Sequence, residues 1–301
     1  MTHATVVDAG PEERARAAIQ LHTLRATDAP LPETIRRVAD AGFEGVEFAG
    51  AFLESDPHAV RDALDDVGVT PVAAHVDLAR IEGNLEAVAD RLRHAGCRHA
   101  VVPHLGGGFF RTNADVDAIA RRLDALAGRL DNYGVRLSYH VSREPFLPPL
   151  DRVGLGRLAR LPSPGIAWRV AAEAVDRTIR GAARTLDVTA FDRLVDRTDD
   201  LTFEVDVGWV AAGGHDPVAV FDRLGDRMPL IHVADVRRTA RFPPAYESVP
   251  PGAGIVDLDR VLDAALERDV EWLVYEDDDP TGPDAAIEHG RSLFERLADG
   301  R

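Results

Sequence analysis

Histidines and carboxylates stand near the ends of eight short apolar runs that are spread along the whole chain. They are His22, Glu47, His75, His104, His140, Asp206, His232 and Glu276. Imidazole and carboxylate groups form the mixed nitrogen and oxygen ligand sets suited to Mn²⁺, Co²⁺, Zn²⁺ or Fe²⁺. They are also the commonest acids and bases in catalysed proton transfer. The set therefore predicts a metal centre, a proton-transfer site or both, provided that one fold brings the residues together.

The stretch LTFEVDVGWV, residues 201–210, carries two of the relevant carboxylates inside a predicted strand. Glu204 and Asp206 are two residues apart, so both point to the same face of that strand. One interpretation is a solvated strand edge. The other is a buried strand whose end holds a cation, with Asp206 as a ligand and Glu204, one layer deeper, supporting another ligand.

The apolar runs alternate with amphipathic segments that are typical of helices, several of which end in glycine. Strands are predicted at 17–23, 45–49, 70–76, 99–105, 135–141, 201–207, 229–235 and 271–277. Eight strand–helix alternations predict a single (β/α)₈ TIM barrel over residues 1–301. A doubly wound open sheet is the alternative, weakened by the lack of a G-x-G-x-x-G motif after the first strand. In a barrel, the carboxyl ends of the strands meet around one pocket.

One region interrupts this rhythm. Residues 147–186 begin with a stretch rich in proline and glycine and continue as a long helix-like run. We interpret them as a loop and helix inserted between the fifth and sixth strands. They are predicted to cover the mouth of the pocket or to form a subunit interface.

The charge composition excludes several kinds of chemistry. The chain has 51 acidic and 35 basic residues, a net charge of −16, and no lysine. A lysine Schiff base, a pyridoxal phosphate anchor and a P-loop lysine are therefore excluded. The acidity argues against a nucleic-acid partner, whose phosphates need cationic side chains. An acidic, lysine-free composition also predicts a halophilic protein that works where salt screens charges over a few ångströms.

Other general features predict a cytoplasmic protein. No apolar run approaches the length of a membrane span, and the first residues lack the pattern of a signal peptide. Cys97 is the one cysteine, which excludes an internal disulfide and fits a reducing compartment. Its place at a predicted helix-to-strand junction favours a buried filler over a nucleophile.

Several motifs together resemble the sugar phosphate isomerase/epimerase superfamily of xylose isomerase-like TIM barrels, which includes ketose 3-epimerases, inosose dehydratases and hydroxypyruvate isomerases. The resemblance spans nearly the whole chain. It is carried by QLHTLR, AGFEGVEFAG, YHVSREPF, DVGWVAAGGHDP, IHVAD, VPPGAGIVDLDRVLDAA and VYEDDD. It implies one divalent metal, Mn²⁺ or Co²⁺ before Zn²⁺, Fe²⁺ or Mg²⁺, on His140, Asp206, His232 and Glu276. It also implies a small sugar or polyol as substrate, and homo-oligomers are common among such barrels.

The chain departs from its nearest subgroup at two motifs. A Tyr-His-Asn-His pattern on the fifth strand reads Tyr139-His140-Val141-Ser142, and a His-x-Lys-Asp pattern on the seventh reads His232-Val233-Ala234-Asp235. A polar residue, a histidine and a lysine are thereby lost from the expected pocket. These changes leave the exact reaction open.

The resemblance implies proton transfer beside a carbonyl, as in an isomerase or epimerase, with Glu276, Glu144 and Glu47 as candidate catalytic carboxylates. Residues expected to bind the substrate are His22, His75, His104, Trp209 and Arg237. The alternatives are a dehydratase acting on a keto-inositol or similar substrate, a non-catalytic metabolite-binding relative, and, less favoured, hydrolysis of DNA as in endonuclease IV-type enzymes.

Overall fold

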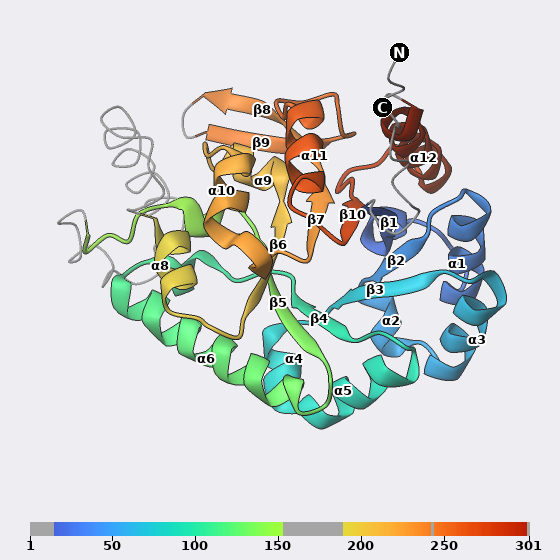
Figure 1. Cartoon of the computed structure of the whole chain (residues 1–301), viewed down its shortest axis with the longest axis horizontal. Coiled ribbons are helices and arrows are strands. Elements are labelled where there is room, and N and C mark those ends of the chain that lie inside the picture. Colours follow the sequence, from blue (N-terminus) through green and yellow to red (C-terminus); the bar gives the residue numbers. More distant parts are fainter. Residues whose placement is uncertain (1–14, 153–188, 242–243, 300–301) are drawn as a thin grey trace, which may run out of the picture.

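A computed structural model describes residues 15–152, 189–241 and 244–299. Eight parallel strands form a closed barrel in the order β1-β10-β7-β6-β5-β4-β3-β2 (Figure 1). The strands are β1 (Arg16–Gln20), β2 (Gly45–Phe48), β3 (Thr70–His75), β4 (His99–Val102), β5 (Arg136–Val141), β6 (Thr202–Asp206), β7 (Leu230–Val233) and β10 (Trp272–Tyr275). The predicted TIM barrel is therefore confirmed.

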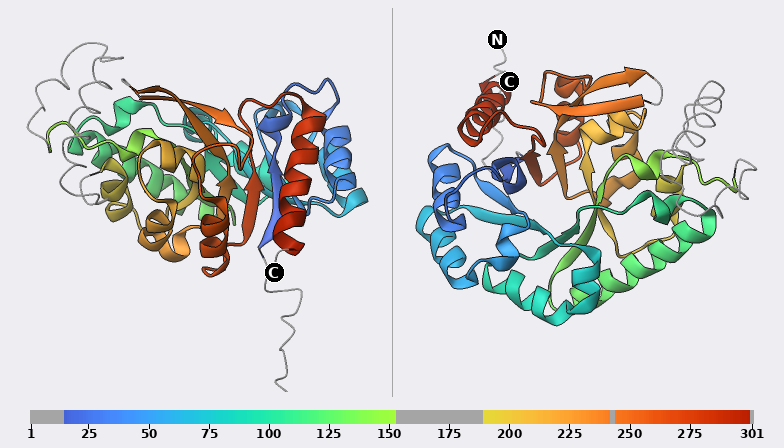
Figure 2. Two further views of the ribbon diagram at one scale, coloured as in Figure 1. Left: turned by 90° about the horizontal axis from the view of Figure 1, so that it is seen from above. Right: turned by 180° about the vertical axis from the view of Figure 1, so that it is seen from behind.

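Helices surround the barrel on the outside, as the two views in Figure 2 show. The α-helices are α1 (Leu31–Asp40), α2 (Ala51–Glu54), α3 (Pro57–Val67), α4 (Leu78–Gly83), α5 (Leu85–His94), α6 (Asn113–Asp131), α8 (Ala190–Asp196), α9 (Val207–Ala212), α10 (Pro217–Leu224), α11 (Leu258–Leu266) and α12 (Pro283–Asp299). Polar caps fix where many of them begin. Thr112 and Asp115, for example, form a capping box at the start of α6. The predicted insertion at 147–186 lies mostly outside the described residues.

β1 and β4 each end three residues before their predicted ends at 23 and 105, which moves two histidines out of the barrel wall. β1 ends at Gln20, whose side chain accepts a hydrogen bond from the backbone of His22 and starts the 3₁₀ turn η1 (Leu21–Leu24). β4 ends at Val102, because Pro103 has no N–H to donate to a neighbouring strand. His22 and His104 therefore lie beyond the strand ends, and both are exposed.

A hairpin that the sequence analysis did not predict follows β7. β8 (Asp235–Arg241) and β9 (Pro244–Val249) pair in antiparallel fashion as a separate two-stranded sheet. The predicted seventh strand, 229–235, runs into this hairpin, so its last residues belong to β8. Figure 1 shows the hairpin beyond the carboxyl end of β7. It stands on the side of the barrel where the site residues gather.

The inside of the barrel is apolar at one end and polar at the other. A small cluster of Ala18, Val72, Ala73, Val101, Leu230, Trp272 and Val274 forms the apolar end. Gly45 makes room for it, since a Cβ at this position would come within 2.7 Å of both Val72 and Trp272. This apolar floor closes one end of the barrel, and the polar side chains gather toward the carboxyl ends of the strands.

None of the helices in the described ranges is long and apolar enough to cross a membrane.

Candidate metal centre

Four side chains from four neighbouring strands converge at the carboxyl end of the barrel. They are His140 on β5, Asp206 at the end of β6, His232 on β7 and Glu276 directly after β10. All four are buried, and one ligand atom from each lies within 4.8 Å of the ligand atoms of the others. The structure thus brings together the four residues that the sequence analysis predicted as metal ligands.

Local contacts leave one unused atom on each of two of these side chains. The Nδ1 of His140 donates to the carbonyl oxygen of Pro103 at 3.1 Å, which directs Nε2 toward the centre. The Oδ1 of Asp206 caps α9 by accepting from the amide of Trp209 at 2.7 Å, which leaves Oδ2. His140 Nε2 and Asp206 Oδ2 are buried without a hydrogen-bond partner and lie 3.7 Å apart.

This arrangement fits a bound cation. Buried polar atoms without partners are costly and rare in proteins. A separation of 3.7 Å is too long for a hydrogen bond, but two ligands of one metal ion take up such a separation. Two imidazoles and two carboxylates are a donor set suited to Mn²⁺, Co²⁺, Zn²⁺ or Fe²⁺, whereas Mg²⁺ prefers oxygen ligands.

A second cluster lies directly beneath and shares His232. Here Glu47 on β2, His75 on β3 and Glu204 on β6 meet the Nε2 side of the His232 ring. His232 Nε2 lies 2.6 Å from Glu47 Oε2 and 3.2 Å from Glu204 Oε2. His75 Nε2 lies 2.8 Å from Glu204 Oε2 and 3.3 Å from Glu47 Oε1. We call Glu47, His75, Glu204 and His232 the lower quartet.

The lower quartet decides between the two interpretations of the stretch at 201–210. Glu204 and Asp206 have no exposed surface, so a solvated strand edge is wrong. Both carboxylates point into the barrel, one to each cluster, because residues two apart on a strand share a face.

Attraction between imidazoles and carboxylates shifts the pKa values of several of these groups. Burial alone would lower the pKa of His75, but the carboxylates of Glu47 and Glu204 outweigh it and raise that pKa to about 10. Burial would raise the pKa of Glu276, yet the neighbouring imidazole of His232 lowers it to about 2. The pKa of Glu204 is likewise held well below its usual value against the effect of burial, by His232 and His75.

The sequence analysis missed two polar groups near this centre. The acidic run after β10 does not project into solvent as a whole, since Asp278 is half-buried, accepts a hydrogen bond from the side chain of Trp209 and lies within the electrostatic field of Glu276 and Asp206. Gln20 ends β1, is fully buried, and has an amide Nε2 without a partner. Position near the end of a barrel strand, the signal that identified the other site residues, could have identified both of them.

Glu144 lies just after β5, in the short 3₁₀ turn η3 (Glu144–Phe146). Its side chain is half-buried, and its Oε2 accepts a hydrogen bond from the hydroxyl of Ser142 at 3.1 Å. The Ser142 hydroxyl also lies 3.4 Å from the hydroxyl of Tyr139. Ser142, which stands where the resembled subgroup has the second histidine of its Tyr-His-Asn-His pattern, therefore orients a carboxylate just after β5.

The structure does not gather every predicted substrate-binding residue. Arg237 lies on the hairpin strand β8, where its exposed guanidinium pairs with Glu247 of β9 at 2.5 Å, so its expected place in the pocket is not supported. His104 is exposed beyond β4. His22 is exposed on η1, although the charge of Glu276 acts on it. His75 and Trp209 do lie at the centre, the first in the lower quartet and the second on α9.

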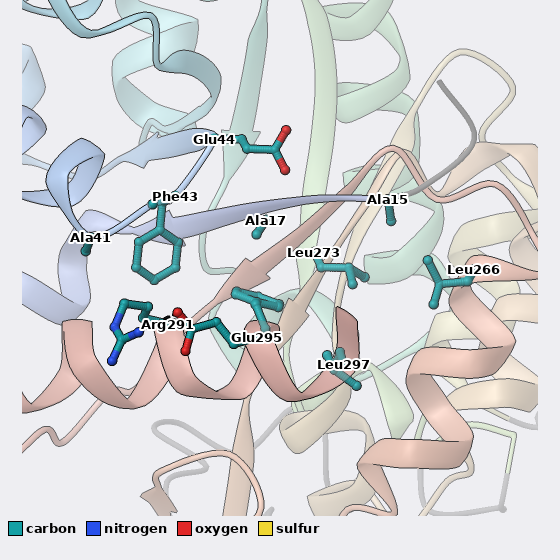
Figure 3. A pocket seen from close by; sticks show the side chains of 12 residues that line it. Ala15, Ala17, Ala41, Phe43, Glu44, Leu266, Leu273, Arg291, Glu295 and Leu297 are labelled. Atoms are coloured by element: carbon teal, nitrogen blue, oxygen red, sulfur yellow. Dashed lines mark hydrogen bonds and ion pairs between the residues drawn. The ribbon is translucent and has the colours of Figure 1, made fainter. Parts of the chain in front are cut away.

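A separate cavity of about 330 Å³ lies between α12 and the barrel wall. Figure 3 shows Phe43, Ala17 and Leu273 on one side of it and Arg291 and Glu295 of α12 on the other. Arg291 pairs with Glu288 and Glu295, so these charged groups are already partnered. Nothing in these walls converges on a ligand, so the four converging side chains at the carboxyl end of the barrel are the better candidate site.

Comparison with known proteins agrees with this fold. No family model matches the sequence. An inosose dehydratase from Geobacillus kaustophilus is 24% identical over 272 residues, which cover 81% of this chain and 79% of that protein. A sugar phosphate isomerase/epimerase from Parabacteroides distasonis has a TM-score of 0.67 at 15% identity, covering 98% of this chain and 96% of the other. A 3-keto-D-glucoside 4-epimerase from E. coli has a TM-score of 0.62 at 15% identity, covering 94% and 100%. The chain is thus similar to the proteins that its motifs resemble.

Proposed function

We propose that the chain is a divalent-metal-dependent isomerase or epimerase that moves a proton next to a carbonyl of a sugar or polyol. The observation that carries this proposal is the convergence of His140, Asp206, His232 and Glu276, with two buried ligand atoms left without partners. The similarity to a sugar phosphate isomerase/epimerase and to a 3-keto-D-glucoside 4-epimerase supports the choice of substrate class.

The four converging residues would hold the ion, with Mn²⁺ or Co²⁺ as the first candidates. A cation in this position would supply a Lewis acid that polarises a substrate carbonyl and favours loss of the neighbouring proton. The apolar floor and the buried walls would exclude water from the reacting atoms. The amide of Gln20 has a free Nε2 that would donate a hydrogen bond to a substrate hydroxyl.

Carboxylates near the centre are the candidates for moving the proton. Glu276 lies among the four converging side chains; His232 lowers its pKa to about 2, so its carboxylate is ionised, but so low a pKa makes it a weak base unless the surroundings change when the site is occupied. Glu144 is oriented by Ser142 and half-buried, which fits a group that approaches the substrate from the end of β5. Two acceptors from different strands would allow removal of a proton at one place and its return at another, as epimerisation or isomerisation requires.

Dehydration is the second candidate function, favoured by the inosose dehydratase among the relatives. The first step would be the same proton removal, followed by loss of a β-hydroxyl in place of reprotonation. A keto-inositol or a similar cyclic polyol would be the substrate. A non-catalytic metabolite-binding role remains the outcome if metal binds but no candidate substrate turns over.

Metal content tests the centre directly. The full chain would be loaded with Co²⁺ or Mn²⁺, dialysed and measured by elemental analysis. We expect one ion per chain in the wild type and strong loss in Asp206→Asn, because asparagine keeps the Oδ1 that caps α9 but replaces the free Oδ2 with an amide. Asp216→Asn is the matched control, since Asp216 caps α10 in the same way away from the centre. An empty wild type after metal addition would contradict the proposal.

Turnover in D₂O separates the two reactions. On a panel of ketoses, keto-sugars and keto-inositols, an isomerase or epimerase should place deuterium on carbon in the recovered product without loss of water. A dehydratase should give an unsaturated ketone or its tautomer.

Glu276→Gln should lower turnover by about 10²-fold or more on the substrate identified, since it removes an ionised ligand and a candidate base. Full turnover in Glu276→Gln would contradict the catalytic part of the proposal.

A further inference from the structure

The ring of His232 belongs to both clusters, and its two nitrogens have different surroundings. Nδ1 faces Glu276 Oε2 at 2.6 Å, on the side where His140 Nε2 and Asp206 Oδ2 have no partner. Nε2 faces Glu47 Oε2 at 2.6 Å and Glu204 Oε2 at 3.2 Å. One ring cannot direct both nitrogens at the same ion. One nitrogen therefore serves as the ligand, and the other serves the lower quartet.

The groups around each nitrogen of His232 indicate which nitrogen would bind the metal and which would contact the lower quartet. On the Nδ1 side the two unpartnered atoms belong to His140 on β5 and Asp206 at the end of β6, so an ion there would satisfy groups that the protein leaves open. On the Nε2 side, Oε2 of Glu47 and Oε2 of Glu204 each already lie within hydrogen-bond distance of an imidazole nitrogen, and only the second oxygen of each carboxylate has no hydrogen-bond partner. A ligating histidine generally donates its other N–H to a carboxylate, which fixes the tautomer and the orientation of the ring.

We propose that Glu47 is a positioning residue whose carboxylate accepts the Nε2–H of His232 and thereby directs the Nδ1 lone pair at the metal, with Glu204 and His75 completing its support. Glu47 is fully buried and lies beneath the ring, on the side away from the open ligand atoms. This place suits the support of a ligand better than contact with a substrate, although the resemblance implied that Glu47 is a candidate base.

His75 explains how two carboxylates are accommodated beneath one imidazole. Without a second cation, Glu47 and Glu204 would repel each other in a medium of low dielectric constant. The Nε2 of His75 lies between them, at 3.3 Å from Glu47 and 2.8 Å from Glu204. Its ring is stacked on that of His232, with centroids 5.6 Å apart and planes 18° apart. One imidazole, that of His75, thus contacts both carboxylates, and the Nδ1 of His232 remains available to bind the metal.

This assignment rests on the proposed metal centre, and Co²⁺ binding to the full chain tests the two separately. In Glu47→Gln, we expect about 10- to 100-fold weaker Co²⁺ affinity in competition with a chelator, still with one ion per chain. The visible spectrum of the bound Co²⁺ should also change, because the ring of His232 is no longer held in one orientation. Ser138→Ala is the control: it removes a buried polar group inside the same barrel that contacts His99 and Thr202 and not the quartet. It should bind Co²⁺ like the wild type.

Three results would overturn the assignment. Equal affinity and an unchanged Co²⁺ spectrum in Glu47→Gln would show that Glu47 does not position the ligand, while the metal centre itself would stand. Two Co²⁺ ions in the wild type, with one lost in His75→Gln, would show that the lower quartet binds a second ion instead. A wild type that binds no Co²⁺ would overturn the proposed function and this assignment together.

Discussion

His99 shows at the scale of one residue how the barrel interior treats an imidazole without a carboxylate partner. It begins β4, is buried, and its Nε2 lies 2.7 Å from the hydroxyl of Ser138. Burial lowers the pKa of His99 to about 4, since nearby Glu204 opposes this effect only in part. The sequence gives no sign of this burial, because a histidine at the start of a strand carries no local signal of its depth inside a barrel.

The lowered pKa predicts a contribution to acid sensitivity. The unfolded chain binds a proton at His99 below about pH 6.5, whereas the folded chain does so only below about pH 4. Stability is therefore lost as pH falls through this window, by at most about 1.4 kcal/mol per pH unit and about 3 kcal/mol in total. His99→Gln should show a flatter fall in its free energy of urea unfolding between pH 6.5 and pH 4. Parallel curves for the two proteins would contradict this account.

At the residue scale the sequence predicted which side chains would meet, but not how. Period-two alternation and position at a strand end identified His140, Asp206, His232 and Glu276. The stagger between neighbouring strands decides how deep each side chain sits, and no local pattern encodes it. For this reason the lower position of Glu47 beneath His232, and the different tasks of the two nitrogens of that ring, became visible only in three dimensions.

At the scale of elements, the loop between β9 and α11 is held by a single carboxylate. Asp235, buried at the start of β8, accepts hydrogen bonds from five backbone amides. They belong to Val236, Gly252, Gly254, Ile255 and Val256, at 2.8 to 3.1 Å. Gly254 is required for this close approach, since a Cβ there would come within 2.2 Å of Asp235 Oδ1. The loop is thereby fixed beside the strand that carries His232.

Asp235→Ala should therefore destabilise the protein by about 3 kcal/mol or more, because several amides would lose their acceptor at once. Asp216→Ala, which removes one hydrogen bond from a backbone amide at the start of α10 and an exposed ion pair with Arg260, should cost only about 1 kcal/mol. Urea unfolding of the two variants beside the wild type measures the difference. Equal losses would mean that the loop does not depend on Asp235.

The sequence predicted the elements unequally. All eight barrel strands follow from apolar runs that are buried on both faces, which is the usual pattern of a parallel sheet. The hairpin of β8 and β9 escaped prediction because DVRRTAR and PAYESV are largely polar and mostly exposed, without a buried face that would give an alternating pattern. The short helix α9 also escaped, since Val207–Ala212 follows the apolar run of β6 without a break.

At the scale of the whole molecule, the net charge of −16 is the dominant electrostatic feature. Many arginines already pair with surface carboxylates, as Arg122 does with Glu82 at 2.9 Å and Arg193 with Asp117 at 2.7 Å. The excess of acidic groups remains, and its self-repulsion opposes the compact state. The absence of lysine does not change the net charge, because each arginine carries the same positive charge that a lysine would.

Salt should therefore stabilise the protein, as the composition predicted for a halophilic chain. Between about 0.1 M and about 2 M sodium chloride, screening of like charges should outweigh the weakening of surface ion pairs and raise the melting temperature. Thermal unfolding followed by circular dichroism, in sodium and in potassium chloride, measures this. An unchanged or lower melting temperature would contradict the prediction.

The closed ring has a consequence for how the protein would acquire the proposed metal ion. β10 pairs with β1, the first strand of the chain, as well as with β7. During synthesis, the set of four ligands is incomplete until Glu276 has been made and β10 has paired with β1 and β7. Ligand strength alone favours copper or zinc over manganese and cobalt. The metal captured would therefore depend on which ions are available in the place where the last strand completes the ring.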